Sequence, residues 1–147
     1  MREILFRGKT TGGEWFYGSL VHRTLFYGDP CDDYVILSDG EFDFDYYEDH
    51  EVITETVGQF TELTDKNGKK VFEGDILKFT DINADYEWIG RVEFGNPNEE
   101  YNWGFQLVYI KGEKPNTDIL LWFDMEDTGA FAEVIGNIHD NPELLEE

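Results

Sequence analysis

Turn-forming residues recur at short intervals along the chain, and this spacing restricts its fold more than any other feature. They stand at Gly12-Gly13, Asp39-Gly40, Asn67-Gly68 and Gly95-Asn96-Pro97. The segments between them are short and rich in Val, Ile, Phe, Tyr and Trp, which favour strands. An aromatic content of 16% also argues against disorder. The pattern predicts a mainly β protein of short antiparallel strands, arranged as a small, partly open barrel or a sandwich.

The individual strands follow from the same pattern. We expect them near residues 3–7, 14–22, 34–37, 41–46, 56–62, 75–80, 87–94, 103–110 and 131–138. A hairpin is expected at Asn67-Gly68, because Asn-Gly supplies the positive φ angles of tight turns. Gly74-Asp75-Ile76, followed by the strand at 87–94, resembles the opening of small SH3-like barrels, where a glycine lets a strand bend.

Helix is expected to be scarce. Asn141, followed by Pro142 and Glu143, is a good start signal for a short C-terminal helical turn at residues 144–147. Residues 118–125 could form a helix or a strand, because a short apolar run does not determine the period.

A chain of 147 residues is expected to form a single domain, 1–147. Within it, Trp15-Phe-Tyr-Gly-Ser-Leu20 aligns with Val71-Phe-Glu-Gly-Asp-Ile76, and Glu55-Thr-Val-Gly-Gln-Phe60 aligns with Glu133-Val-Ile-Gly-Asn-Ile138. This internal sequence similarity suggests two related β units, at about 1–63 and 64–147. If so, Phe16 and Phe72 should both be buried, and Gly18 and Gly74 should occupy matching bends.

A family resemblance rests on phrases at both ends and in the middle of the chain. They are Arg2-Glu-Ile-Leu-Phe-Arg-Gly-Lys9, Gly13-Glu-Trp-Phe-Tyr-Gly18, residues 55–77 and Val134-Ile-Gly-Asn-Ile-His-Asp-Asn-Pro-Glu-Leu-Leu145. With these phrases the chain resembles the YopX family of phage and prophage proteins. The resemblance implies an accessory protein of a phage or prophage, in the bacterial host cell, and it brings no biochemical activity with it.

The charge of the chain limits the classes of molecule that it is expected to bind. There are 33 acidic and 11 basic side chains, for a formal net charge of −22. Such a field repels phosphate backbones and anionic lipids, so we expect neither direct nucleic-acid binding nor membrane association. The start of the chain lacks a signal-peptide core, and the single cysteine, Cys31, fits a reducing compartment. We therefore expect a cytoplasmic location.

An acidic segment is the main candidate site. Residues 24–65 contain 13 Asp or Glu residues and no Lys or Arg. As a strand, residues 41–46 would place alternate carboxylates on one face. This face is either a solvated edge that deters aggregation, a surface for a basic partner, or a site for a divalent metal. The candidate partner-binding residues are Asp39, Glu41, Asp43, Asp45, Glu48, Asp49 and Glu51.

Catalytic and metal signatures find little support. The histidines lie in unrelated surroundings, and no nucleophile elbow or phosphate-binding glycine loop occurs. Residues 81–85 begin like an EF-hand loop, but Tyr86 occupies the glycine position and Val92 the position of the bidentate glutamate. We expect no catalytic residues, no cofactor and no metal.

The remaining features complete the functional hypothesis. The aromatic residues Trp15, Tyr17, Trp88, Trp103 and Trp122 are expected to be core rather than a base-stacking platform. A β-rich chain tends to cover its strand edges with a neighbour, which favours a homo-oligomer. We predict a non-enzymatic protein that contacts a basic host or phage protein through its acidic surface. The alternative is a carboxylate-based, metal-dependent enzyme or nuclease-like accessory, which requires three or four converging carboxylates.

Overall fold

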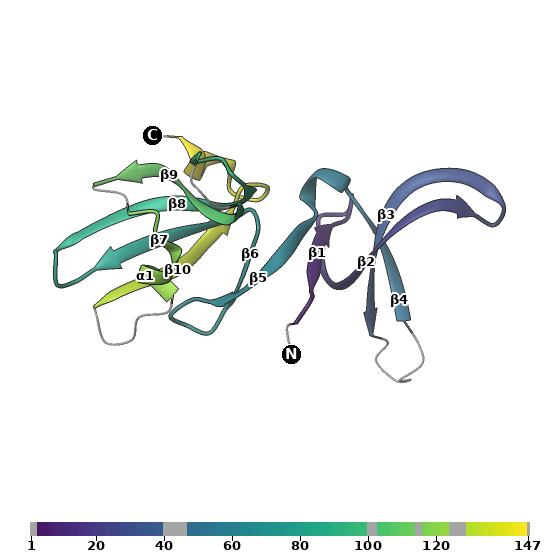
Figure 1. The fold of residues 1–147 in the computed structure, drawn as a ribbon. Helices are drawn as coiled ribbons and strands as arrows, with labels where there is room; N and C mark the ends of the chain where they lie inside the picture. Colours follow the sequence, from purple (N-terminus) through teal and green to yellow (C-terminus); the bar gives the residue numbers. More distant parts are fainter. Residues whose placement is uncertain (1–2, 40–46, 100–102, 114–115, 124–128, 147) are drawn as a thin grey trace. The chain divides into compact units, whose positions relative to one another are not determined.

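The chain is mainly β, as predicted (Figure 1). The structure is a computed structural model that describes residues 3–39, 47–99, 103–113, 116–123 and 129–146. The chain forms two compact units, Met1–Phe60 and Thr61–Glu147. Their described strands pair antiparallel in open sheets and do not close a barrel.

The first unit is a meander. Its elements are β1 (Phe6–Lys9), β2 (Trp15–Phe26), β3 (Asp29–Asp39), β4 (Tyr47–Val52) and a 3-10 turn, η1 (Thr54–Thr56), followed by the start of β5 (Gly58–Thr64). The strand order is β4-β3-β2-β1-β5. Because consecutive strands are neighbours from β1 to β4, short connections suffice.

A small core lies where the chain after β4 returns to the end of β1. Ile36 and Val52 are buried, and Val52 packs so closely on Gly8 that a Cβ there would lie 2.8 Å from the valine side chain. The backbone N–H of Ile53 donates to the carbonyl of Lys9 at 2.8 Å. The sheet of the first unit is therefore curved rather than flat.

A two-stranded hairpin arm, residues 23–33, extends from this sheet. The pairing of β3 with β4 begins at Tyr34, so residues 29–33 of β3 pair with β2 alone. Tyr27 and Gly28 form the two-residue turn, with φ angles of 51° and 84°. Two positive φ angles match the right-handed twist of the flanking strands. Figure 1 shows β2 and β3 arching away from β1 and β4.

The second unit holds the larger core. Its further elements are β6 (Lys70–Phe72), β7 (Asp75–Asp81), β8 (Tyr86–Gly95), β9 (Gly104–Gly112), α1 (Ile119–Phe123), β10 (Ala130–Asn137) and a 3-10 turn, η2 (Pro142–Leu145). Four of these strands form a sheet in the order β10-β7-β8-β9, and β6 lies beside β5.

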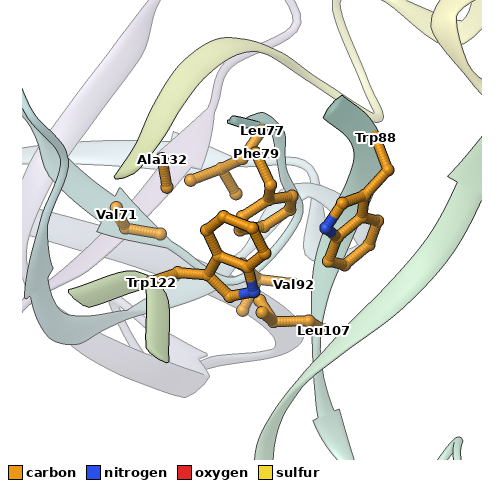
Figure 2. Packing of buried hydrophobic residues seen from close by; sticks show 8 residues of the cluster. All are labelled: Val71, Leu77, Phe79, Trp88, Val92, Leu107, Trp122 and Ala132. Carbon is orange, nitrogen blue, oxygen red and sulfur yellow. The ribbon is translucent and has the colours of Figure 1, made fainter. Parts of the chain in front are cut away.

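Aromatic packing fills this core (Figure 2). The ring of Phe79 stacks on Trp88 with centroids 4.2 Å apart, and Trp122 from α1 meets Phe79 at 5.3 Å. All three side chains are buried. Of the run at 118–125, which the sequence left open between helix and strand, residues Ile119–Phe123 thus form a short helix that covers the sheet with Trp122.

The expected strands overlap the observed ones, apart from 41–46, which lies outside the described residues. The turn at Asn67-Gly68 joins β5 to β6 as predicted, although only Gly68 of the pair has a positive φ. The C-terminal helical turn is the 3-10 turn η2. The strand β4 was not expected at its position, whereas β6 lies where the hairpin at Asn67-Gly68 places its second strand, near Val71.

The positions of Gly18 and Gly74 do not support the proposed internal repeat. Gly18 lies within β2, whereas Gly74 has a φ of 93° between β6 and β7. Phe72 is buried and Phe16 is only half-buried. These glycines do not occupy matching bends, and a duplication stays a prediction.

Candidate functional site: an acidic hollow beside the hairpin arm

The seven predicted partner-binding residues are described to different extents. Glu41, Asp43 and Asp45 lie outside the described residues. Asp39 and Glu48 are placed by their backbones alone, in β3 and β4. The geometry of the candidate site therefore rests on the last two residues of the predicted set.

Those two residues, Asp49 and Glu51, lie on one face of β4. Asp49 stands opposite Leu37 and Glu51 opposite Val35 in the pairing with β3. Both carboxylates are exposed. The Asp49 carboxylate lies 3.7 Å from the guanidinium of Arg23 on β2. The two residues are two positions apart in the strand, which places their side chains on the same side of the sheet.

Glu51 belongs to a concave site, which we call the acidic hollow. Its volume is about 280 Å³. The residues that line it are Thr11, Asp32, Asp33, Glu51, Val52, Ile53 and Thr54. Two of its carboxylates, Asp32 and Asp33, come from the β3 strand of the hairpin arm, and the third comes from β4. No Lys or Arg is among the lining residues.

Asp33 is matched by a cation from the neighbouring strand. The Arg23 guanidinium donates two hydrogen bonds to its carboxylate, at 2.9 and 2.7 Å. These bonds hold the pKa of Asp33 below its ordinary value and raise the pKa of Arg23 above its own. A bidentate pair of this kind fixes both side chains as well as their charges. Asp33 therefore adds little unbalanced charge to the hollow.

Asp32 has a weaker local partner. Its carboxylate lies 2.6 Å from the Nε2 atom of His22, and the two side chains are 85% and 46% exposed. The His22 ring stacks on Tyr34 with centroids 4.5 Å apart. Because an exposed pair is screened by water, the contact stabilises the fold little. Within the described residues, Glu51 has no ion-pair partner, so it is the least balanced charge of the hollow.

Cys31 directly precedes Asp32 and Asp33 of the hollow. Its Sγ donates to the carbonyl of Arg23 at 3.4 Å. Partial burial, with a smaller contribution from the nearby Asp33 carboxylate, raises the pKa of the thiol above its ordinary value. Since only the thiolate is a strong nucleophile, the geometry gives Cys31 a structural position.

A second hollow, of about 220 Å³, lies at the turn between β7 and β8. Its lining residues are Thr80, Asp81, Ile82, Asp85, Tyr86 and Glu87. Its acids are already engaged in part, because Asp81 accepts hydrogen bonds from the backbone N–H groups of Asn83 and Ala84. Glu87 lies 3.3 Å from the ammonium of Lys78. Two of its three acids thus have local partners.

Over the described ranges, no three His, Cys, Asp or Glu side chains are grouped closely enough to hold a metal ion. The three acids that line the acidic hollow are therefore not grouped as a metal site. None of the described helices is long and apolar enough to cross a membrane.

The expectation that the aromatics are core is only partly correct. Trp88 and Trp122 are buried, but Trp103 is 76% exposed and Tyr17 is 47% exposed. Trp15 is half-buried, with the guanidinium carbon of Arg7 4.8 Å from its ring centroid. The prediction is wrong for Trp103 and Tyr17, because strand composition indicates a β structure without showing which face of the strand is covered.

Sequence reasoning counted Asp32 and Asp33 in the acidic segment but did not place them in a site. The pairing of β2 with β3 sets Asp33 opposite Arg23, and that register depends on the turn at Tyr27-Gly28 and on the irregularity between Arg23 and Leu25. A two-residue turn ending in glycine between apolar segments was the signal that could have revealed the hairpin. Nothing in the sequence indicated that Thr11 would reach the same hollow.

Comparisons with known proteins bear on the family and the fold. The family model described as "YopX protein" matches residues 6–146. A solved structure, the crystal structure of protein EF1440 from Enterococcus faecalis, aligns over 98% of this chain and 99% of that chain. The two are 23% identical, with a TM-score of 0.50. This likeness concerns the fold alone. No curated protein matches the chain.

Proposed function

We propose that this chain, which belongs to the YopX family, is a phage or prophage accessory protein that acts by protein–protein contact. In this proposal the acidic hollow receives a Lys or Arg side chain of a basic host or phage protein. The observation that carries the proposal is the position of Glu51, an exposed carboxylate in a concave site with two further acids and no cation among its lining residues.

Electrostatics favours such a partner. The net charge of −22 creates a field that attracts positively charged surfaces and speeds their encounter. Residues 24–65, which include most of the hollow, contain no Lys or Arg. The attraction acts over a Debye length of about 8 Å at physiological salt. Binding through this surface should therefore weaken steeply as salt is added.

One difference favours the acidic hollow over the second hollow. In each of them two acids have local partners, Asp81 and Glu87 in the second hollow and Asp33 and Asp32 in the acidic hollow. The acidic hollow is preferred because most of its lining belongs to residues 24–65, which contain no Lys or Arg.

The experiment compares matched double neutralisations. One variant carries Asp32→Asn and Glu51→Gln, and the control carries Asp81→Asn and Asp85→Asn in the second hollow. Each is used to capture proteins from a bacterial lysate at low and high salt, and the captured protein is identified, purified and its affinity measured. We expect the wild type and the control to bind a basic protein at low salt, and the first variant to bind it at least about tenfold more weakly.

Two results would contradict the proposal. One is equal affinity of the two double variants for the purified partner. The other is an affinity that does not change with salt, because a charge-driven contact must be screened. A third variant, with Glu41, Asp43 and Asp45 replaced by Gln or Asn, extends the test to the predicted residues outside the described ranges. It should slow association and flatten its salt dependence.

A further inference from the structure

We propose that two copies of this chain associate through the outer edge of β2, where the strand runs into the hairpin arm. The two β2 strands would pair antiparallel about a two-fold axis. This inference concerns self-association and does not depend on the proposed function, because the acidic hollow is lined by residues of β3, β4 and the adjoining loops rather than by β2.

The edge exists because two strand pairings end at different places. The pairing of β1 with β2 stops at Gly18, whereas the pairing of β2 with β3 continues to Phe26. From Ser19 onward, the described structure therefore has no strand on the outer side of β2. A long strand edge presents backbone N–H and C=O groups that can pair with another chain.

Apolar side chains accompany this edge. Val21 and Leu25 stand four residues apart in β2 and are 37% and 62% exposed. Tyr27, in the turn at the tip, is 92% exposed. Strand edges that must stay single are usually protected by charges, prolines or bulges. The pairing of β2 with β3 has one irregularity, between Arg23 and Leu25, and on either side of it Val21 and Leu25 offer a neighbour apolar surface.

The charge distribution favours a second copy of this chain as the binding partner at this strand edge. Two chains of net charge −22 repel each other, so they can approach only where acids are lacking. Residues 15–28 form a stretch without Asp or Glu, and their only Lys or Arg, Arg23, is matched by Asp33. The acids of the arm, Asp29, Asp32 and Asp33, belong to β3 instead. A basic partner would be attracted to β3, whereas a second copy of this acidic chain can approach β2 without meeting carboxylates of that strand.

Pairing also resolves a weakness of the arm. A two-stranded hairpin is marginally stable in water, whereas three or more strands with an apolar face can persist. Two arms joined by their β2 strands form a four-stranded sheet and bury Val21 and Leu25 of both copies. A two-fold arrangement closes on itself, so it gives a dimer rather than a filament.

The first test is the mass in solution at physiological salt, by light scattering across a concentration series. We expect twice the chain mass of 17.2 kDa. The variant Leu25→Glu should raise the dimer dissociation constant at least about tenfold, because each copy then places a carboxylate in the contact. The control is Ile82→Glu, at a residue of similar exposure (66% against 62%) in the second unit, and it should remain dimeric.

The second test covers the possibility that Leu25→Glu disturbs the arm itself. Backbone hydrogen exchange of the wild type is measured at low and high protein concentration. We expect amides of residues 19–26 to exchange more slowly at the higher concentration. A wild-type monomer at high concentration, a dimer unchanged by Leu25→Glu, or protection confined to other strands would each overturn the proposal.

Discussion

The Asp65 carboxylate accepts a hydrogen bond from the backbone N–H of Val134 at 2.9 Å, which joins residues 69 positions apart. Its other oxygen accepts from the N–H groups of Asn67 and Lys69, each at 2.9 Å. The residue is only 7% exposed. One buried carboxylate therefore shapes the turn between β5 and β6 and connects that turn to β10.

Replacing Asp65 by Ala should lower the free energy of unfolding of the second unit by about 2–4 kcal/mol, because buried backbone donors lose a charged acceptor. Asp65→Asn should cost less, since its amide oxygen can still accept within the turn. Urea unfolding measures the change. The control is Glu113→Ala at an exposed position. Equal losses for the Asp65→Ala variant and this control would contradict the account.

Phe79 contacts both Trp88 and Trp122 in the aromatic core of the second unit, and the two tryptophans also contact each other. Phe79→Ala should destabilise that unit by about 3–5 kcal/mol, because it removes a buried ring and leaves a cavity. Phe94→Ala is the matched control, since Phe94 is 57% exposed. Denaturant unfolding should separate the two variants clearly, and similar midpoints would show that Phe79 is not the packing centre.

Gly18 allows β2 and β3 to approach closely. A Cβ at this position would collide with the carbonyl oxygen of Leu37. We expect Gly18→Ala to lower the thermal midpoint of the first unit and to speed hydrogen exchange along β3, because backbone must move to admit the methyl group. Gly12→Ala, where the nearest atom lies 3.6 Å away, should be nearly neutral. A neutral Gly18→Ala variant would contradict the close approach.

The ion pair of Arg23 and Asp33 predicts how the hairpin arm responds to acid. The pKa of Asp33 is lowered chiefly by its hydrogen bonds from Arg23. The pair therefore contributes its full stabilisation above the ordinary carboxyl pKa of about 3.9, and this is lost as the pH falls through the lower folded-state value. In NMR titration, Asp33 should titrate below that ordinary value, and the arm should loosen only there. Titration at or above about 3.9 would refute the pairing.

The sequence predicted most of the β structure, because strand residues and turn residues are local signals. Asn67-Gly68 marks its turn by chemistry alone, and the observed turn lies there. The position of β4 at 47–52 was missed, since residues 41–46 have a clearer alternation than the strand that pairs with β3. The helix of Trp122 could not be assigned, because burial against the sheet, rather than the period of a five-residue run, decides it.

The sequence predicted the negative charge of the candidate site but not its geometry. Glu51 and Asp49 were named from an acidic segment, but the hollow also needs Asp32 and Asp33, which β-strand pairing brings beside β4. Arg23 escaped notice because it lies one residue outside that segment, and only the register with Asp33 gives it a partner. Long-range register is set by packing and turn geometry together, which local patterns do not reveal.

The most direct test of the proposed function is to locate the bound cation on the surface. A short lysine-rich peptide is titrated into the ¹⁵N-labelled chain at low salt, followed by NMR, and the titration is repeated at physiological salt. We predict that the largest amide shifts fall at Asp32, Asp33 and residues 51–54, and that they shrink as salt rises. Largest shifts at residues 80–87, or shifts spread evenly over the acidic surface, would contradict the account.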